Sequence, residues 1–415
     1  MLVALLVGVS VFLVIVGFGS LVALFKGCLT LRRLRRNDPA HDRTILLKSP
    51  LTPAISVIAV PRDDSPESIE FVRRLSTLQY SRHEVVVVLD GQTDKQVRTW
   101  TLEFGMSRSA RGGGEVRSVY ESQEPLRIVL VDLETGAVAT ALDVGIDTAA
   151  CPVIAIVHQD TDFDIGLLLN LIGPMLEDPE GTIAVCGLSA PPARAGGLVS
   201  LFSDLESLRT WMGRSAATSG WGKLLPAAGS TMLVRREAFY KAGGGRGGIV
   251  ASWLRLHAIA NTRIAFAPAQ TSRYAQARTL KDLSKRVLRD QAELAAAIRG
   301  DGMSGVMSIG WGVPALLLTQ WVRPLLETLA YLLLIVVLVS GHADGKLAEL
   351  VVLSTIGMGM LISMAAVVFR EFVEFRGTAP GRLAGLFFAA IPENLGYRQL
   401  RNWWLIVGIF AGKNG

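Results

Sequence analysis

A long apolar run without any charge lies at the N-terminus of this sequence. Residues 2–25, LVALLVGVSVFLVIVGFGSLVALF, would span about 30 Å of hydrocarbon as a helix. A cleaved signal peptide normally has a basic start and a shorter apolar run, whereas the basic residues here follow the run. They are Lys26, Arg32, Arg33, Arg35, Arg36 and Arg43. We therefore expect a retained transmembrane helix with its N-terminus outside and the basic cluster in the cytoplasm.

The C-terminal third contains two further apolar runs, at 310–341 and 347–369. The loop between them is short, and Arg370, Arg376 and Arg382 follow the second run. This pattern predicts a hairpin of at least two transmembrane helices with its ends in the cytoplasm. The last apolar stretches, 383–391 and 401–410, are too short to span, and we expect an interfacial or re-entrant pair, with a broken third span as the alternative.

The composition agrees with a membrane protein that has a polar middle. Half of the 415 residues are hydrophobic and 19% are charged, which excludes a disordered chain and is too apolar for an ordinary soluble enzyme. The net charge is +6, and the basic residues beside the apolar runs favour membrane lipids as partners rather than nucleic acid. We expect a multi-pass protein of the plasma (inner) membrane. Three distant cysteines exclude a disulfide framework and a CxxC zinc site.

The middle of the chain alternates short apolar runs with helical patterns. Continuous apolar runs predict buried parallel strands, and a spacing of three or four predicts the helices between them. The predicted strands are 54–60, 84–89, 127–133 and 153–158, and the predicted helices are 66–80 and 136–150. This order is typical of a doubly wound α/β domain. We divide the chain into an N-terminal transmembrane helix (1–26), a basic cytoplasmic linker (27–49), the α/β domain (50–300) and a C-terminal membrane region (301–415).

Acidic residues follow three of the predicted strands. Asp63 and Asp64 follow the first, Asp90 and Asp94 the second, and Asp160, Asp162 and Asp164 the last. Ligands of such sheets bind beyond the carboxyl ends of the strands. Carboxylates at this edge suit a nucleotide together with Mg²⁺ or Mn²⁺. The alternative is that these residues form turns and helix caps.

Several segments in their order resemble family 2 glycosyltransferases, which have the GT-A fold. The segments are SVIAVPRDDSPESIEFVRRLSTLQYSRHEVVVVLDGQTD (56–94), ALDVGID (141–147), VIAIVHQDTDFD (153–164), GSTMLVRREAFYKAGG (229–244) and RIAFAP (263–268). The flanking helices resemble those of membrane-embedded polysaccharide synthases. The resemblance implies a hexosyltransferase that moves a sugar from a nucleotide sugar to a lipid-linked or glycan acceptor at the cytosolic face.

The resemblance also implies roles for individual residues of the donor site. Pro61, Asp64, Asp90 and Asp94 would bind the nucleotide. Asp160 matches the second aspartate of the family's DxD metal motif, and His158 replaces the first. A neutral imidazole still ligates Mn²⁺. The alternative for His158 is a core histidine at the end of a buried strand.

On the acceptor or diphosphate side, the resemblance implies binding roles for Arg235 and Arg236, which lie in GSTMLVRREAFYKAGG (229–244). Arg286 and Arg289 fall where the family has its QxxRW motif, although this sequence has KRVLRDQ (285–291) without tryptophan. Two arginines are still suited to bind a diphosphate.

The family's catalytic base is missing at its usual place. GGIVASWLRLHA (247–258) aligns with the helix that follows this base, but no Asp or Glu occurs between Glu237 and Asp282. Asp162 and His257 are the remaining candidates for a base. Two hypotheses follow: a divergent membrane glycosyltransferase, or a catalytically inactive relative that serves as a scaffold or as one of several subunits of a membrane complex.

Overall fold

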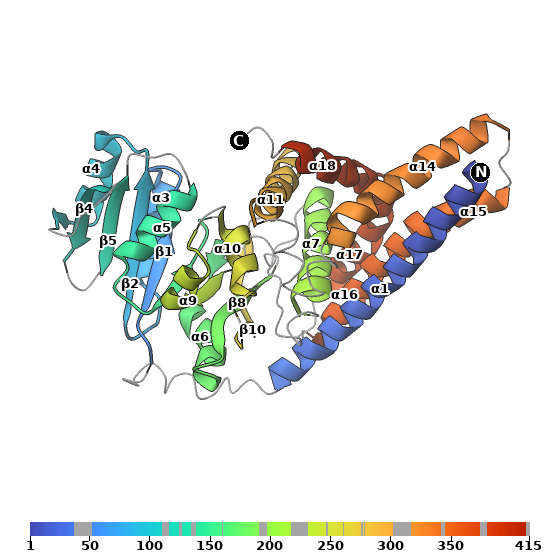
Figure 1. Ribbon diagram of the computed structural model, residues 1–415. Helices are drawn as coiled ribbons and strands as arrows, with labels where there is room; N and C mark the ends of the chain where they lie inside the picture. Colours follow the sequence, from blue (N-terminus) through green and yellow to red (C-terminus); the bar gives the residue numbers. More distant parts are fainter. Residues whose placement is uncertain are drawn as a thin grey trace. The chain divides into compact units, whose positions relative to one another are not determined.

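The structure is a computed structural model (Figure 1), and the statements below concern the residues that it describes. These are residues 1–36, 52–109, 116–123, 127–133, 138–159, 161–190, 197–216, 231–245, 248–259, 261–274, 277, 279–301, 317–341, 345–373 and 380–411.

The chain divides into two compact units. The sheet unit comprises residues 37–190 and 229–275, and the helical unit comprises 1–36, 191–228 and 276–415. The sequence-based division assigned 191–228 and 276–300 to the α/β domain, whereas the structure groups both segments with the apolar helices.

The sheet unit is built on a ten-stranded mixed sheet, in the order β3-β4-β5-β2-β1-β6-β9-β8-β10-β7. Strands β5, β2, β1 and β6 are parallel to one another, as are β8 and β10, and the other pairs are antiparallel. The bounds are β1 (Ile55–Ala59), β2 (His83–Asp90), β3 (Met106–Arg108), β4 (Val116–Ser122), β5 (Ile128–Leu133), β6 (Val153–Ile156), β7 (Thr161–Phe163), β8 (Thr182–Ala190), β9 (Met232–Arg235) and β10 (Arg263–Tyr274).

Helices cover both faces of the central strands. One face, which includes Val57 and Val87, packs against the apolar residues of α3 (Pro66–Ser76), α4 (Asp94–Glu103) and α6 (Leu167–Glu177). The other face packs against α5 (Val138–Thr148), where a Cβ on Gly145 would lie 2.9 Å from the side chains of Ile58 and Val88. Burial on both faces explains the unbroken apolar runs. The predicted α/β fold is confirmed.

The strand order locates the crevice of the sheet. From β1 the chain moves outward to β2 and then β5, and it returns with β6 on the other side of β1. In open α/β sheets, ligands bind beyond the carboxyl ends of the strands at such a reversal of order. In this unit that place is the end of β1, between the ends of β2 and β6. Two short helices, α9 (Arg236–Lys241) and α10 (Gly248–Leu256), complete the unit.

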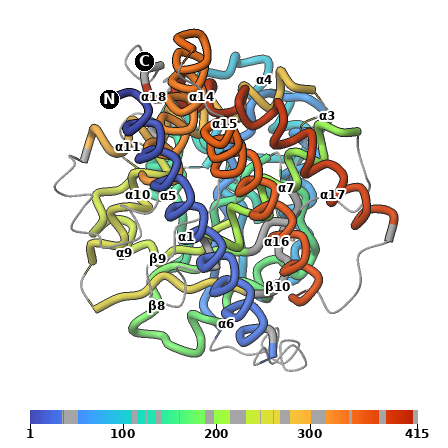
Figure 2. Tube along the Cα trace, turned by 90° about the vertical axis from the view of Figure 1, so that its right-hand side faces the viewer, coloured from blue at the N-terminus to red at the C-terminus, as the bar shows by residue number. Residues whose placement is uncertain are grey.

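The helical unit contains three helices that are long and apolar enough to cross a membrane. They are Leu2–Leu34, Leu318–Val339 and Gly345–Val373. The prediction of one N-terminal and two C-terminal spans is thereby confirmed. The first span lies in α1 (Leu2–Arg36). The second consists of the π-helical segment η2 (Leu318–Val322) and α14 (Arg323–Val339). The third consists of α15 (Gly345–Val352), the π-helical segment η3 (Leu353–Gly357) and α16 (Met358–Val373). Figure 2 traces α1, α14, α15 and α16 along one another.

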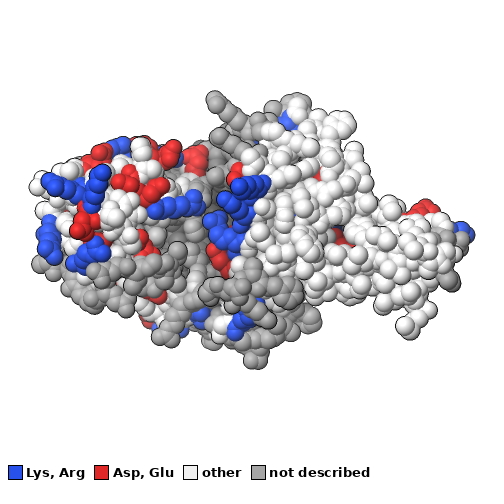
Figure 3. All heavy atoms as spheres, turned by 90° about the horizontal axis from the view of Figure 1, so that it is seen from above, with Lys and Arg blue, Asp and Glu red and all other residues white. Residues whose placement is uncertain are grey.

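The three candidate spans pack together through one apolar seam. Leu6, Val9 and Leu13 of α1 lie against Ala330 and Leu333 of α14, and the seam continues to Val337, Leu347 and Val351. The opposite sides of these helices remain apolar and exposed, as at Phe18 and Leu332. Figure 3 shows a helical surface that carries few charged side chains. An apolar surface of this extent is consistent with contact with lipid.

Six further segments are described in the helical unit. They are α7 (Leu198–Thr210) with η1 (Trp211–Ala216), α11 (Leu280–Asp301), and α17 (Pro380–Pro392) with η4 (Glu393–Tyr397) and α18 (Arg398–Ala411). The apolar stretches at 383–391 and 401–410 lie in α17 and α18. The chain bends between α17 and α18, where Leu395 and Gly396 leave the helical conformation.

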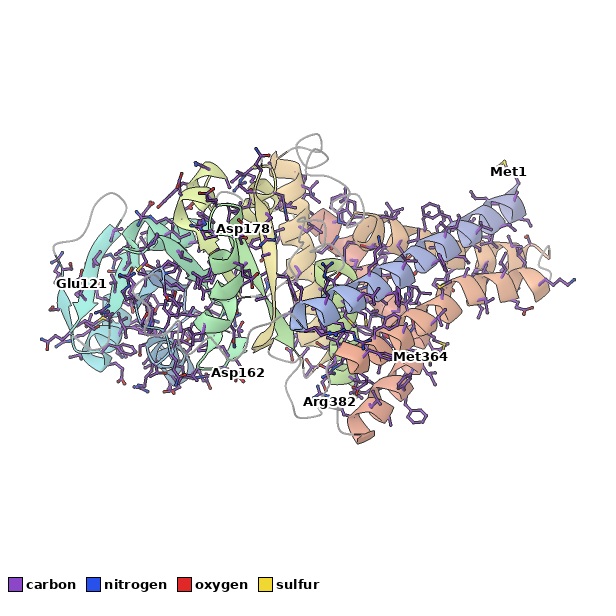
Figure 4. All side chains as sticks on the ribbon, turned by 90° about the horizontal axis from the view of Figure 1, so that it is seen from below. Met1, Glu121, Asp162, Asp178, Met364 and Arg382 are labelled. Carbon is purple, nitrogen blue, oxygen red and sulfur yellow. The ribbon has the colours of Figure 1, made fainter. Side chains whose placement is uncertain are left out.

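A cluster of buried ion pairs connects these helices. Glu327 of α14 accepts hydrogen bonds from Arg323 (2.9 Å), Arg398 and Asn402 (2.8 Å). Three more pairs join α7 to the C-terminal segments: Arg382–Asp204 (3.0 Å), Arg401–Glu206 (2.6 Å) and Arg209–Glu393 (2.5 Å). Figure 4 labels Arg382. The sequence analysis did not anticipate this ion-pair cluster.

Candidate nucleotide site

Two glutamine side chains hold the backbone of Arg62 at the crevice. The amide N–H of Arg62 donates to Oε1 of Gln159, at 3.0 Å. Its carbonyl oxygen accepts from Nε2 of Gln92, at 3.3 Å. Gln92 follows β2 and Gln159 follows β6, so the two side chains reach the β1 loop from the two neighbouring strands. Gln159 Nε2 donates in turn to the Ser68 hydroxyl at the start of α3, at 2.7 Å.

These bonds determine which way both amide groups point. A backbone N–H can only donate and a carbonyl oxygen can only accept. The contact to the Arg62 N–H must therefore be the oxygen of Gln159, and the contact to the Arg62 carbonyl must be the nitrogen of Gln92. The Oε1 atom of Gln92 consequently faces away from Arg62.

Two hydrogen-bond acceptors at the end of β2 have no partner among the described residues. They are Oδ1 of Asp90 and Oε1 of Gln92, and both atoms are buried. Only 8% of Gln92 is exposed. Burial raises the pKa of the Asp90 carboxyl above its usual range. Because a buried acceptor without a donor costs free energy, these two atoms favour a ligand that donates hydrogen bonds.

The aspartates of the β1 loop have local partners. Asp63 accepts from the backbone and hydroxyl of Ser65 and from the hydroxyl of Ser68, and these bonds lower its pKa. Ser65 is the N-cap of α3, because its hydroxyl accepts from the backbone N–H of Ser68, and Asp63 supports this cap, which agrees with the alternative of turns and caps. Asp64 accepts from Gln96 Nε2 on α4, at 3.2 Å. The loop that contains Pro61 is thus tied to α3 and α4.

Asp94 belongs to a small charged group at the outer side of the crevice. Its exposed carboxylate lies 3.0 Å from Arg117 of β4. The same guanidinium lies 3.8 Å from the buried carboxylate of Asp132 on β5, which pairs with Leu89 in the sheet. The sequence analysis missed Asp132, although an aspartate inside the apolar run RIVLVDL was a usable signal.

The predicted metal ligands are described only in part. His158 follows β6 and is half-buried, and its carbonyl accepts from the backbone N–H of Thr161 at 3.0 Å. Asp160 lies outside the described residues. Within the described part of the chain, no three His, Cys, Asp or Glu side chains gather in a way that could hold a metal ion.

The side chains of the two candidate bases, Asp162 and His257, make different contacts. The half-exposed carboxylate of Asp162, labelled in Figure 4, forms an ion pair with Arg74 of α3 at 2.7 Å. His257, just after α10, is 7% exposed, and its ring lies edge-on to Trp253 with 6.4 Å between the centroids.

Arg235 and Arg236 lie at the other edge of the sheet. Arg235 is paired with Val153, the first residue of β6, so it lies at the amino end of the parallel strands. Its guanidinium donates to the carbonyls of Thr182 and Pro179, and that of Arg236 donates to the carbonyl of Ala149. These contacts support the sheet, and the structure does not bring the two arginines to the edge that carries Asp90.

Arg286 and Arg289 belong to the helical unit, on α11. Their part in a diphosphate site stays a prediction. The aligned helix at 248–256 is present as α10, where Arg255 donates to the carbonyls of Ala242 and Gly244.

Comparisons with known proteins find likeness in structure only. No family model and no curated protein matches the sequence. The chain is similar to the mannosyltransferase PcManGT from Pyrobaculum calidifontis, solved with GDP-Man and Mn²⁺, with 18% identity, a TM-score of 0.54, and coverage of 94% of this chain and 99% of that one.

Two further solved structures match the chain with lower TM-scores. One is glucosyl-3-phosphoglycerate synthase from Mycobacterium tuberculosis, with 16% identity, a TM-score of 0.40 and coverage of 63% and 85%. The other is S. aureus TarS 1–349, with 13% identity, a TM-score of 0.37 and coverage of 83% and 91%. At 18% identity the likeness to the mannosyltransferase concerns the fold, which is that of GT-A glycosyltransferases.

Proposed function

We propose that this protein is a membrane-bound glycosyltransferase that transfers a hexose from a nucleotide sugar to a lipid-linked or polysaccharide acceptor. The observation that carries this proposal is the pair of buried, unpartnered acceptors on Asp90 and Gln92. They lie at the crevice of the sheet, where α/β domains bind nucleotides. The GT-A fold and the three candidate spans support a donor site on a membrane-anchored domain.

The chemistry requires a nucleophile, a leaving group and a proton acceptor. A hydroxyl of the acceptor attacks the anomeric carbon, the bond from that carbon to the diphosphate breaks, and the diphosphate leaves with the electron pair. The hydroxyl proton passes to a base. Asp162 and His257 remain the candidates in this chain, and Asp162 would first have to leave Arg74. A nucleotide held at Asp90 and Gln92 would direct its diphosphate along the crevice.

A divalent cation is part of the proposal, with His158 and Asp160 as its ligands. When bound, such a cation neutralises the charge of the diphosphate. An imidazole nitrogen suits Mn²⁺ better than Mg²⁺, which prefers oxygen ligands.

The proposed orientation follows from the charges next to α1. Lys26, Arg32, Arg33 and Arg36 lie in the last part of this 35-residue helix, after its apolar part. Basic residues at the end of a span favour the cytoplasmic side. We therefore assign the sheet unit to the cytosolic face of the plasma (inner) membrane, with Met1 outside.

Calorimetric titration of the detergent-purified chain with UDP and GDP, with and without Mn²⁺, tests the donor site. We expect binding that depends on the metal and is lost in Asp90→Ala and in Asp160→Ala. Asp147→Ala is the matched control, because this carboxylate lies on the last turn of α5 and binds the Tyr240 hydroxyl. Absence of binding under every metal condition would overturn the proposal.

The second candidate function is an inactive scaffold or subunit of a membrane complex. The ion pair of Asp162 and the carbonyl contacts of Arg235 and Arg236 favour it, because each occupies a side chain that catalysis would need. Nucleotide binding without transfer to any extracted lipid acceptor would support this alternative.

A further inference from the structure

The strand-end glutamine that holds the β1 loop also presents an acceptor to the ligand. The Nε2 group of Gln92 is committed to the carbonyl of Arg62, which leaves Oε1 as the open atom. The residue is more than nine-tenths buried, and Oε1 has no partner among the described residues. Asp90, two positions earlier, contributes a second open acceptor.

The donors around the crevice are already in use. The N–H of Arg62 donates to Gln159, and Nε2 of Gln159 donates to Ser68. On α4, Nε2 of Gln96 donates to Asp64. Among the described side chains at the end of β2, the two buried polar atoms without a partner, Oδ1 of Asp90 and Oε1 of Gln92, are acceptors, so a ligand that pairs with them has to supply the hydrogens.

The common bases differ in the hydrogens on their pairing edges. Uracil has one N–H between two carbonyl acceptors, and adenine and cytosine each have one amino donor beside a ring acceptor. Guanine has two adjacent donors, the ring N1–H and the 2-amino group. Two protein acceptors match guanine, whereas with uracil one carbonyl would face a protein acceptor and leave both unsatisfied.

We propose that Asp90 and Gln92 together select a guanine nucleotide, so that the donor is a guanosine diphosphate sugar. This inference rests on the proposed function, because it names the donor class of the same site. Gln92 is then a specificity-determining residue: its nitrogen anchors the β1 loop and its oxygen reads the base.

The test compares GDP, inosine diphosphate and UDP by calorimetry on the full chain with Mn²⁺. Inosine diphosphate differs from GDP only by lacking the 2-amino group. We expect GDP to bind about tenfold or more tightly than either of the others, the effect of one unpaired buried hydrogen-bonding group. Equal binding of GDP and inosine diphosphate, or equal binding of GDP and UDP, would overturn the guanine assignment. The latter result would also indicate that the two acceptors bind ribose hydroxyls.

Two variants distinguish recognition of the nucleotide base by Gln92 from its support of the loop after β1. Gln92→Met removes the unpartnered acceptor and one anchor of Arg62, whereas Gln159→Met removes the other anchor, together with its bond to Ser68, and leaves the acceptor of Gln92 in place. We expect the preference for GDP over UDP to fall about tenfold in Gln92→Met and to stay unchanged in Gln159→Met. Equal loss of the preference in both variants would contradict a role of Gln92 in reading the base.

The outcomes also distinguish this inference from the proposed function. Binding of UDP as tightly as GDP would overturn the guanine assignment and leave the glycosyltransferase proposal standing. Absence of binding for all three nucleotides would overturn both. If Gln92→Met does not fold, the comparison of GDP with inosine diphosphate on the unaltered chain still decides the assignment.

Discussion

The acceptors buried at the end of β2 in the sheet unit and the carboxylates buried in the helical unit differ in their partners. In the sheet unit, Asp90 and Gln92 each keep a buried acceptor without a partner among the described residues. In the helical unit, the carboxylates of Asp204, Glu206, Glu327 and Glu393 each form an ion pair with at least one arginine. A ligand from water can complete the first site, whereas apolar helices offer charges no outside partner. The unpartnered acceptors at the end of β2 are therefore suited to bind a ligand, whereas the paired carboxylates of the helical unit hold its helices together.

The largest expected effect concerns the centre of the ion-pair cluster. Glu327→Gln would leave Arg323 and Arg398 without their shared carboxylate, and we expect a loss of about 3–5 kcal/mol in the free energy of unfolding. Thermal unfolding in detergent, followed by tryptophan fluorescence, measures this loss. The matched control is Glu349→Gln, an exposed acid on α15. Similar unfolding midpoints for the two variants would show that the ion-pair cluster does not stabilise the fold.

Asp290 of α11 tests whether every buried acid of the helical unit is stabilised by its neighbours, because it is a half-buried acid near several charges. Burial raises its pKa to about 6, Arg286 and Arg289 oppose the shift, and Glu293 and Glu206 add to it. The folded-state pKa lies above the unfolded one, so this group's contribution to stability is lost as the pH rises through about 6. Asp290→Asn should therefore stabilise the protein by about 2–3 kcal/mol at pH 8.

The same substitution should have a smaller effect at pH 5, about half of that at pH 8, because the carboxyl of Asp290 is then ionised in the unfolded chain but still largely protonated in the folded state. Unfolding midpoints of both proteins between pH 5 and 8 measure the effect. An equal stabilisation at both ends of this range would show that ionisation of Asp290 is not its cause.

Asp90 tests whether the open acceptors serve a ligand rather than the fold. Burial raises the pKa of Asp90, so its ionised form costs stability in the absence of ligand. We expect Asp90→Asn to raise the unfolding midpoint slightly, by about 1 kcal/mol or less in free energy, while nucleotide binding falls. Unfolding with and without GDP measures both properties. A lower midpoint without nucleotide would assign Asp90 to the fold.

The smallest effect is expected at the surface of the sheet unit. Arg74 and Asp162 form an ion pair with about half of each side chain exposed. Such pairs contribute about 0–1 kcal/mol, so Arg74→Ala should hardly change the unfolding midpoint. Arg73→Ala, one position earlier on α3 and also ion-paired, is the control. A loss well above that of the control would show that Arg74 holds β7 in place.

Much of the fold could be predicted from local patterns. The unbroken apolar runs identified β1, β2, β5 and β6, because strands buried on both faces have no polar side. Length and absence of charge identified the candidate spans. The strands β3, β4, β7, β8 and β9 were not predicted, and β3 and β7, with three residues each, are too short for a period to be recognised.

The site could be predicted only in part. Asp90 was found because it follows a recognisable strand, and acids at strand ends are typical of nucleotide sites. Gln92 and Gln159 were not found. Glutamine is common in turns, and its role here depends on β1 lying between β2 and β6, which brings both side chains to one peptide unit.

The hydrophobic pattern along the chain was sufficient to specify two kinds of structure, a covered parallel sheet and apolar spans, because each requires an unbroken run of apolar residues. Which polar atoms are paired and which stay open depended on the folded arrangement. Residues 62, 92 and 159, or 209, 327 and 398, are far apart in the chain, and only packing decides whether a donor meets an acceptor.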